Sequence, residues 1–154
     1  MKKEDALSKV PLFRDVSRRN IEGLAAICVE RDFKAGEFLM KQGDEGIGLY
    51  IIVSGAVEVR MKAADGQHHP VASNGAGDVL GEITVIDGAP RPMDVVATEP
   101  TVSLVLASWE FMAFVKAHPM VAVEILPVLA KRFREAQAAL SSGAVHSAIS
   151  SSCP

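Results

Sequence analysis

The sequence has few cysteines, few aromatic residues and no excess of basic charge. Its 154 residues include two cysteines, one Trp and one Tyr, and the formal net charge is −3. Cys28 and Cys153 form no CxxC motif and imply no disulfide framework, which fits a reducing compartment. A nucleic-acid-binding domain usually has a pI above about 9, whereas the pI of this chain is about 5.8. We therefore expect no direct binding to nucleic acid.

Long apolar runs are also missing. No window reaches the roughly 18 consecutive apolar residues of a membrane-spanning helix, and the N-terminal MKKEDALSKV lacks the apolar core of a signal peptide. The length is that of one ordinary domain, and the content of 49% hydrophobic and 23% charged residues is typical of a folded soluble protein. These features predict a single cytoplasmic domain.

Motifs of catalysis and metal binding are absent from the sequence. It contains no GxSxG motif, no Walker lysine loop and no paired catalytic carboxylates. His68 and His69 form the only histidine cluster, and neighbours on a strand point to opposite faces, so the two side chains would not converge on one metal. We expect neither an enzyme nor a metal site.

Short strands and tight turns are predicted for the middle of the chain. Before them, residues 17–30 have the apolar spacing of an amphipathic helix with Ser17 as N-cap. In AVEVRMK, Val57, Val59 and Met61 alternate with polar residues, which predicts one buried face, and Asp65-Gly66 predicts a hairpin turn. The strand-like runs indicate a sandwich or jelly roll. They are residues 49–53, 56–62, a segment near 70, 94–97 and 102–107.

Two helices are expected to follow the strands. Ser108 can cap a helix that ends near Ala117, and a second helix begins at Pro119 and ends near Leu140. Pro127 predicts a kink in the second helix, which is either a break between two helices or a hinge. We expect the serine-rich tail, residues 141–154, to be disordered.

The last helix carries an apolar stripe that has two interpretations. Its members recur at spacings of three and four residues, as in a helix face that is buried. The stripe could pack on the domain itself, or it could form a homodimer seam with a second copy. It comprises Ile125, Leu129, Phe133, Ala136 and Leu140.

The segment GEITVIDGAPRPMDVV, residues 81–96, has the residue types of an anion site. Gly81 permits a tight turn, and Glu82, Ile83 and Thr84 can start a short helix whose free N–H groups face an anion. Arg91 adds a planar fork of donors that matches phosphate oxygens. Alternatively, Glu82 and Arg91 could pair with each other and hold the loop closed.

Several glycine motifs in this order resemble the cyclic nucleotide-binding domain of catabolite-activator-type regulators, protein kinase A regulatory subunits and cyclic-nucleotide-gated channels. The resemblance covers about residues 7–140. The motifs are VPLFRDVS, KAGEFLMKQGDEG, YIIVSGAVEV, GAGDVLGE, and PR followed by VVA.

The resemblance implies a mainly β fold with flanking helices over residues 1–140. The expected architecture is an eight-stranded jelly-roll barrel with N-terminal helices, a short helix in the phosphate-binding cassette and two C-terminal helices. It also implies that Glu82 binds the ribose of a cyclic nucleotide and that Arg91 binds the cyclic phosphate. A purine lid would come from the last helix, where Arg132 and Arg134 are the candidates.

The cassette departs from the family pattern directly after Arg91. Pro92 has neither the N–H that the family uses for phosphate nor the threonine hydroxyl that favours cGMP, Met93 replaces a small residue, and Asp94 adds a negative charge that faces either the phosphate or solvent. We therefore expect a regulatory domain that binds cAMP rather than cGMP, with weakened affinity. The alternative is a degenerate module that has lost its ligand and acts in dimerisation or protein docking.

Overall fold

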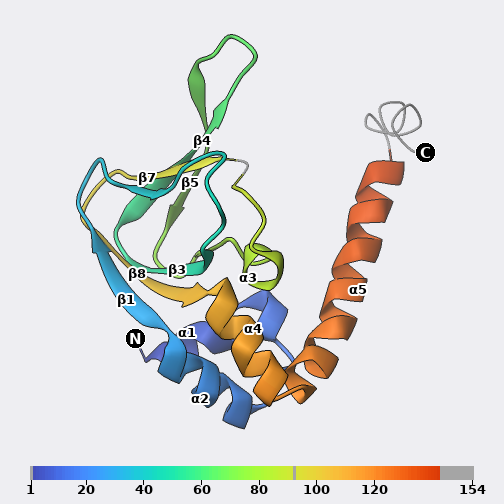
Figure 1. Ribbon diagram of the computed structural model, residues 1–154. Coiled ribbons are helices and arrows are strands. Elements are labelled where there is room, and N and C mark those ends of the chain that lie inside the picture. Colours follow the sequence, from blue (N-terminus) through green and yellow to red (C-terminus); the bar gives the residue numbers. More distant parts are fainter. Residues whose placement is uncertain (1, 92, 143–154) are drawn as a thin grey trace.

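The computed structural model describes residues 2–91 and 93–142, and its first elements are three short helices (Figure 1). They are α1 (Lys3–Ser8), the 3-10 turn η1 (Pro11–Phe13) and α2 (Arg18–Ile27). Ser17 caps α2 as predicted, because its side chain accepts a hydrogen bond from the Asn20 N–H at 3.4 Å. The helix ends three residues earlier than the predicted end at residue 30, because Cys28 is extended and the β-branched Val29 begins a strand.

In the described residues eight strands follow and form two four-stranded antiparallel sheets, with the orders β1-β8-β3-β6 and β2-β7-β4-β5. The predicted mainly β jelly roll with flanking helices is confirmed. The sequence pattern missed the three shorter or more exposed strands β1, β2 and β6. The strands are β1 (Val29–Phe33), β2 (Phe38–Met40), β3 (Gly48–Ser54), β4 (Ala56–Lys62), β5 (His68–Gly75), β6 (Val79–Leu80), β7 (Asp94–Ala97) and β8 (Thr101–Ala107).

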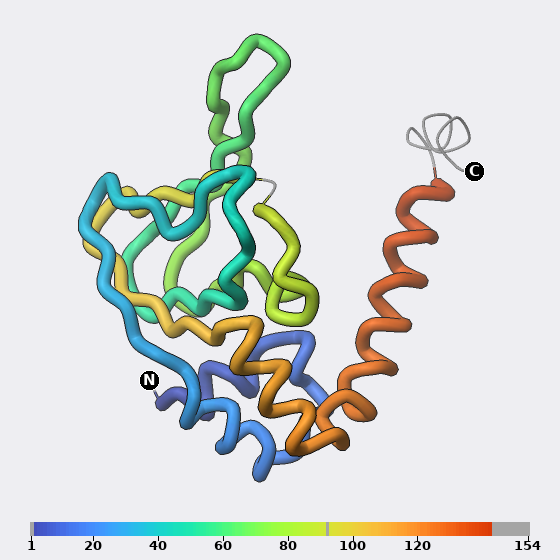
Figure 2. The backbone as a smooth tube through the Cα atoms, in the orientation of Figure 1, coloured from blue at the N-terminus to red at the C-terminus, as the bar shows by residue number. Residues whose placement is uncertain are grey.

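Strands β4 and β5 form a hairpin that projects beyond the rest of the barrel (Figures 1 and 2). Its turn contains the predicted Asp65-Gly66, and Gly66 has a φ of +80°. Val57 and Val59 are buried as expected, but Met61 is 43% exposed. The prediction that Met61 belongs to the buried face is therefore wrong, because this part of β4 extends past the core.

The core has two parts, which lie on opposite faces of β3. Tyr50 and Ile52 point into the barrel between the two sheets, whereas Leu49 and Ile51 pack against the helices. This alternation is the period-two pattern of a strand that is covered on both sides. The helix side of the core also contains Phe13, which stacks on Phe111 of the C-terminal part of the chain. Strand β3 thus contributes side chains to both parts of the core.

The two C-terminal helices are α4 (Ser108–Ala117) and α5 (Met120–Ser141). Ser108 is the first residue of α4 and makes no cap hydrogen bond, so its predicted role as N-cap is wrong. Helix α5 continues through Pro127, so a break between two helices at that residue is also wrong. Since Pro127 lies on an exposed turn, water can hydrogen-bond the carbonyl that the proline leaves free. No described helix alone is long and apolar enough to cross a membrane; only α4 and α5 taken together pass that test, and they are bent by 119°.

The apolar stripe of α5 divides into two halves. Ile125 is buried and Leu129 packs against the helix side of the core, whereas Phe133, Ala136 and Leu140 are exposed. The second half of α5 stands apart from the rest of the backbone (Figure 2). The first half is thus ordinary core. Ser141 still belongs to α5, and the rest of the predicted tail from residue 143 lies outside the described residues.

Candidate functional site

Arg91 is a buried cation between α3 (Thr84–Asp87) and β7, and only 5% of its surface is exposed. Its Nη2 donates to the Gly48 carbonyl at 2.6 Å, and its Nη1 donates to Thr84 Oγ1 at 3.1 Å. The guanidinium carbon also lies 5.8 Å from the centre of the Tyr50 ring. Burial lowers the pKa of Arg91 from its ordinary value, and Tyr50 partly opposes that shift. Arg91 forms no ion pair with a carboxylate of residues 2–91 or 93–142.

Gly81 lies directly against the Arg91 guanidinium. Its φ of +73° is in the left-handed region that glycine favours, which matches the predicted tight turn. A side chain here would meet Arg91 at once, because an added Cβ would lie 2.4 Å from Arg91 Nη1. The same Cβ would lie 2.4 Å from the Gly48 carbonyl oxygen. Gly81 is therefore required both for the turn and for the position of Arg91.

The cassette helix α3 begins at Thr84, two residues after the predicted start at Glu82. Gly88, with a φ of +63°, ends it and donates its N–H to the Thr84 carbonyl at 2.8 Å. Over the described part of the chain, the N–H groups of Glu82, Ile83 and Thr84 donate to no protein acceptor. Free N–H groups beside a buried cation form a site that favours an anion.

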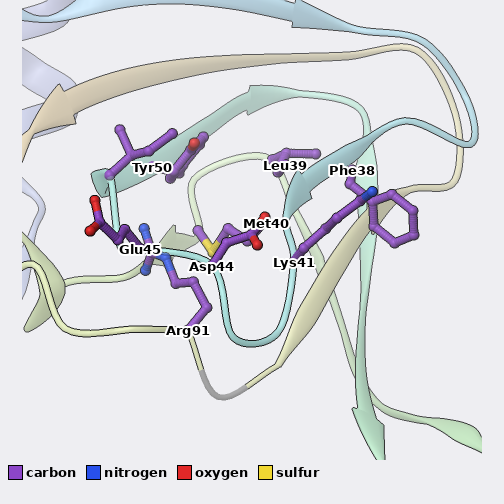
Figure 3. Close-up of a pocket in the computed structure, with 9 residues that line it drawn as sticks. Phe38, Leu39, Met40, Lys41, Asp44, Glu45, Tyr50 and Arg91 are labelled. Atoms are coloured by element: carbon purple, nitrogen blue, oxygen red, sulfur yellow. The ribbon is translucent and has the colours of Figure 1, made fainter.

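Two hollows meet at Arg91 and Met40. The first, of about 330 Å³, is drawn in Figure 3, where the Arg91 side chain extends from its loop toward Tyr50. The Tyr50 hydroxyl is buried there without a hydrogen-bond partner among the described residues. Burial raises the pKa of Tyr50, while Arg31 and Arg91 oppose that rise. This hollow is lined by Phe38, Leu39, Met40, Lys41, Asp44, Glu45, Ile47, Tyr50 and Arg91.

The second hollow, of about 210 Å³, contains most of the predicted site residues. Here Gly81, Ile83, Thr84, Arg91 and Met93 lie together beside the barrel interior. The remaining lining residues are Met40, Val59, Leu80 and Val95. Met93 therefore lines the same hollow as Arg91. Pro92 lies outside the described residues.

Glu82 and Arg91 do not pair with each other. One oxygen of Glu82 accepts the Leu12 N–H at 2.6 Å, and the other pairs with Arg132 Nη1 at 2.5 Å. The alternative of a Glu82–Arg91 salt bridge is therefore wrong, because both Glu82 oxygens face η1 and α5 instead. Of the two lid candidates, Arg132 reaches the cassette, whereas Arg134 is exposed on α5.

Asp94 faces neither solvent nor the second hollow. It is 8% exposed, its Oδ1 accepts the Gln42 N–H at 2.7 Å, and its Oδ2 lies 2.9 Å from His68 Nδ1. The expectation of an exposed or phosphate-facing Asp94 is wrong, because the β2–β3 loop and β5 surround the carboxylate. Within the described ranges, no three His, Cys, Asp or Glu residues are grouped as a metal ion would need.

Replacing Arg132 with alanine is expected to loosen α5 without unfolding the barrel. The ion pair with Glu82 is partly buried, with side-chain exposures of 34% and 15%, so its loss should cost about 1 kcal/mol of α5 docking. Hydrogen exchange would show faster exchange in the second half of α5, while the exposed Arg134→Ala variant would serve as control. Equal exchange in the two variants would contradict an anchoring role for Arg132.

Comparison with known proteins gives a match to a protein-family model. Residues 30–118 match the family model described as "Cyclic nucleotide-binding domain". The "Cyclic AMP receptor protein" of Thermus thermophilus is 31% identical over 126 residues, which are 82% of this chain and 58% of that protein. The chain thus spans less than two thirds of the length of the curated relatives matched first.

Solved structures agree with the sequence match. The N-terminal domain of a transcriptional regulator from Streptomyces coelicolor A3(2) has a TM-score of 0.80 and 28% identity, covering 90% of this chain and 99% of that one. The regulatory subunit of a cAMP-independent protein kinase A from Trypanosoma brucei has a TM-score of 0.67 and 25% identity, covering 84% and 45%. The relatives thus include one that is named a cyclic AMP receptor and one that is described as cAMP-independent.

Proposed function

Because the chain belongs to the cyclic nucleotide-binding domain family, we propose that it is a regulatory, non-catalytic module that binds a cyclic nucleoside monophosphate at Arg91. The observation that carries the proposal is a buried guanidinium with no carboxylate partner in residues 2–91 and 93–142. A buried charge is costly unless an opposite charge neutralises it. The phosphate of the ligand supplies that charge.

The donors around Arg91 support a phosphate as the bound group. Arg91 has five N–H donors, of which the hydrogen bonds to Gly48 and Thr84 use two. The unoccupied N–H groups of Glu82, Ile83 and Thr84 lie on the adjoining turn. A phosphate oxygen bound between these donors would make charge-assisted hydrogen bonds, which are stronger than neutral ones.

We propose cAMP rather than cGMP as the ligand, bound with reduced affinity. Pro92 lacks the hydroxyl that favours cGMP in this family, and it also lacks the N–H that the family uses for the phosphate. Losing one hydrogen bond to a charged group costs about 1.5–3 kcal/mol, or roughly tenfold to a hundredfold in affinity. The relative from Thermus thermophilus, whose name includes cyclic AMP, is consistent with this choice.

The second candidate function is a module that has lost its ligand and serves in dimerisation or docking. The small size of the second hollow, about 210 Å³, favours it, since typical ligand pockets measure roughly 300–1,000 Å³, whereas the first hollow of about 330 Å³ at Arg91 favours binding. Met93 and Met40 line the second hollow, and methionine side chains can adapt to a ligand. A thermal-shift screen with cyclic nucleotides separates the two functions. A sensing module would gain about 2.7 kcal/mol of stability at a hundredfold excess over Kd, and a docking module would gain none.

Glu82 provides a route from the ligand to the terminal helix. Its carboxylate holds Leu12 of η1 and Arg132 of α5 at the same time. A ribose hydroxyl that approaches the cassette would compete with these partners for Glu82. Ligand binding would then shift a pre-existing equilibrium of α5 relative to the barrel.

We further propose that the second half of α5 pairs with a second copy of the chain. Phe133 is 65% exposed, and Ala136 and Leu140 follow it at the spacing of a coiled-coil seam. Because this module has a net negative charge, we expect it to contact another protein rather than nucleic acid through this surface.

Charged residues on this seam are expected to convert the dimer into a monomer. Phe133→Glu and Leu140→Glu would place carboxylates opposite each other across the interface, while Ala138→Glu puts the same charge on another face of α5 as a control. Sedimentation at several protein concentrations is the measurement. If the seam variants sediment like Ala138→Glu, or the unmodified chain is monomeric throughout, the pairing is disproved.

A further inference from the structure

Thr84 is held in a fixed orientation beside Arg91. Its Oγ1 accepts the hydrogen bond from Arg91 Nη1 at 3.1 Å, and the residue lines the second hollow. Its methyl group occupies the space that a side chain at position 46 would take, because a Cβ added to Gly46 would lie 2.2 Å from Thr84 Cγ2. A β-branched residue has few χ1 rotamers. With the methyl against Gly46, the hydroxyl is directed toward Arg91.

The Thr84 hydroxyl retains a hydrogen atom that it can donate. A hydroxyl carries one donor and two acceptor lone pairs, and the contact with Arg91 uses one lone pair, since Arg91 is the donor. In residues 2–91 and 93–142, the hydroxyl donates to no protein acceptor. An anion bound to Arg91 from the second hollow would therefore lie within reach of both groups.

The cassette lacks a backbone hydrogen-bond donor at Pro92, eight positions after Thr84. Pro92 has no N–H, whatever its conformation. The segment thus combines a missing backbone donor with a side-chain hydroxyl that contacts the phosphate-binding arginine. The two features are complementary, because the hydroxyl can make the type of hydrogen bond that the proline cannot.

We propose that the Thr84 hydroxyl donates a hydrogen bond to the ligand's phosphate and substitutes for the backbone donor that Pro92 lacks. The inference rests on the proposed binding of a cyclic nucleotide at Arg91. It assigns to the Thr84 side chain a role separate from that of the cassette N–H groups. It also means that the departure at Pro92 weakens the site less than the loss of one phosphate contact would.

The test compares two substitutions at position 84 of the full chain by calorimetric titration with cAMP. Thr84→Val keeps the shape and removes the hydroxyl, so affinity should fall about tenfold to a hundredfold. Thr84→Ser keeps the hydroxyl and should bind within about threefold of the unmodified chain, the difference reflecting the lost methyl contact with Gly46. Equal binding by Thr84→Val and the unmodified chain would overturn the inference.

A second readout separates phosphate contact from a structural role. In the two phosphorothioate diastereomers of cAMP, sulfur replaces one or the other exocyclic oxygen and accepts hydrogen bonds poorly. The unmodified chain should prefer one diastereomer, and Thr84→Val should reduce that preference by about tenfold. An unchanged preference with weaker binding would show a structural role and overturn the inference. If the unmodified chain binds neither cAMP nor cGMP, the proposed function fails and this inference fails with it, whereas normal binding by Thr84→Val refutes the hydroxyl contact alone.

Discussion

Arg91→Ala is expected to abolish cyclic nucleotide binding and to leave the fold intact. Arg91 is the buried cation at which both hollows meet, and a phosphate would receive at least two charge-assisted hydrogen bonds from it. At about 1.5–3 kcal/mol for each bond, affinity should fall by at least a hundredfold.

The stability of the Arg91→Ala variant should change little. The substitution removes two hydrogen bonds, to Gly48 and Thr84, and also removes a buried charge that no carboxylate of the described ranges neutralises. These effects oppose each other. Calorimetric titration and thermal unfolding measure both quantities, with Arg134→Ala as a matched loss of an exposed arginine. Binding of cAMP by Arg91→Ala at the affinity of Arg134→Ala would disprove the assignment of Arg91.

Gly81→Ala is expected both to destabilise the fold and to eliminate cyclic nucleotide binding. A non-glycine residue at a φ of +73° is strained by about 1–2 kcal/mol. The new Cβ would also overlap Arg91 Nη1 and the Gly48 carbonyl, each at 2.4 Å, and overpacking typically adds about 1–3 kcal/mol. We expect a total loss of about 2–5 kcal/mol in the free energy of unfolding, with the guanidinium displaced from the phosphate position.

Gly77→Ala provides the control for the backbone conformation. Gly77 has a φ of +91°, but an added Cβ would meet no atom within 4 Å. This variant should therefore lose only the conformational part, about 1–2 kcal/mol, and should still bind ligand. Denaturant unfolding of the two variants gives the comparison. Equal destabilisation of both would mean that the contact between Gly81 and Arg91 has no energetic consequence.

Local patterns in the sequence predicted the parts of the fold that depend on neighbouring residues. The alternation along β4 identified Val57 and Val59 as buried, and the Asp65-Gly66 turn was located correctly. Met61 follows the same alternation, yet it is exposed because the hairpin extends past the core. Periodicity predicts the direction of a side chain, but not whether another element covers it.

The arrangement of the candidate site depended on contacts that are distant in sequence. The turn at Gly81 could be predicted from residue types, and Thr84, which contacts Arg91, lies only seven positions before it in the same cassette. Glu82, in contrast, pairs with Leu12 and Arg132, which belong to the two ends of the chain. Spacing alone did not distinguish a Glu82–Arg91 salt bridge from a ligand pocket formed by the same two residues. Only the packing of η1 and α5 beside the cassette decides which groups Glu82 meets.

Calorimetric titration of the unmodified chain with cAMP and cGMP decides whether this chain binds a cyclic nucleotide through Arg91. We predict saturable heat for cAMP with one site per chain, and weaker binding of cGMP. The absence of heat from either nucleotide at millimolar concentration would disprove cyclic nucleotide binding and leave a module that has kept the fold without the ligand.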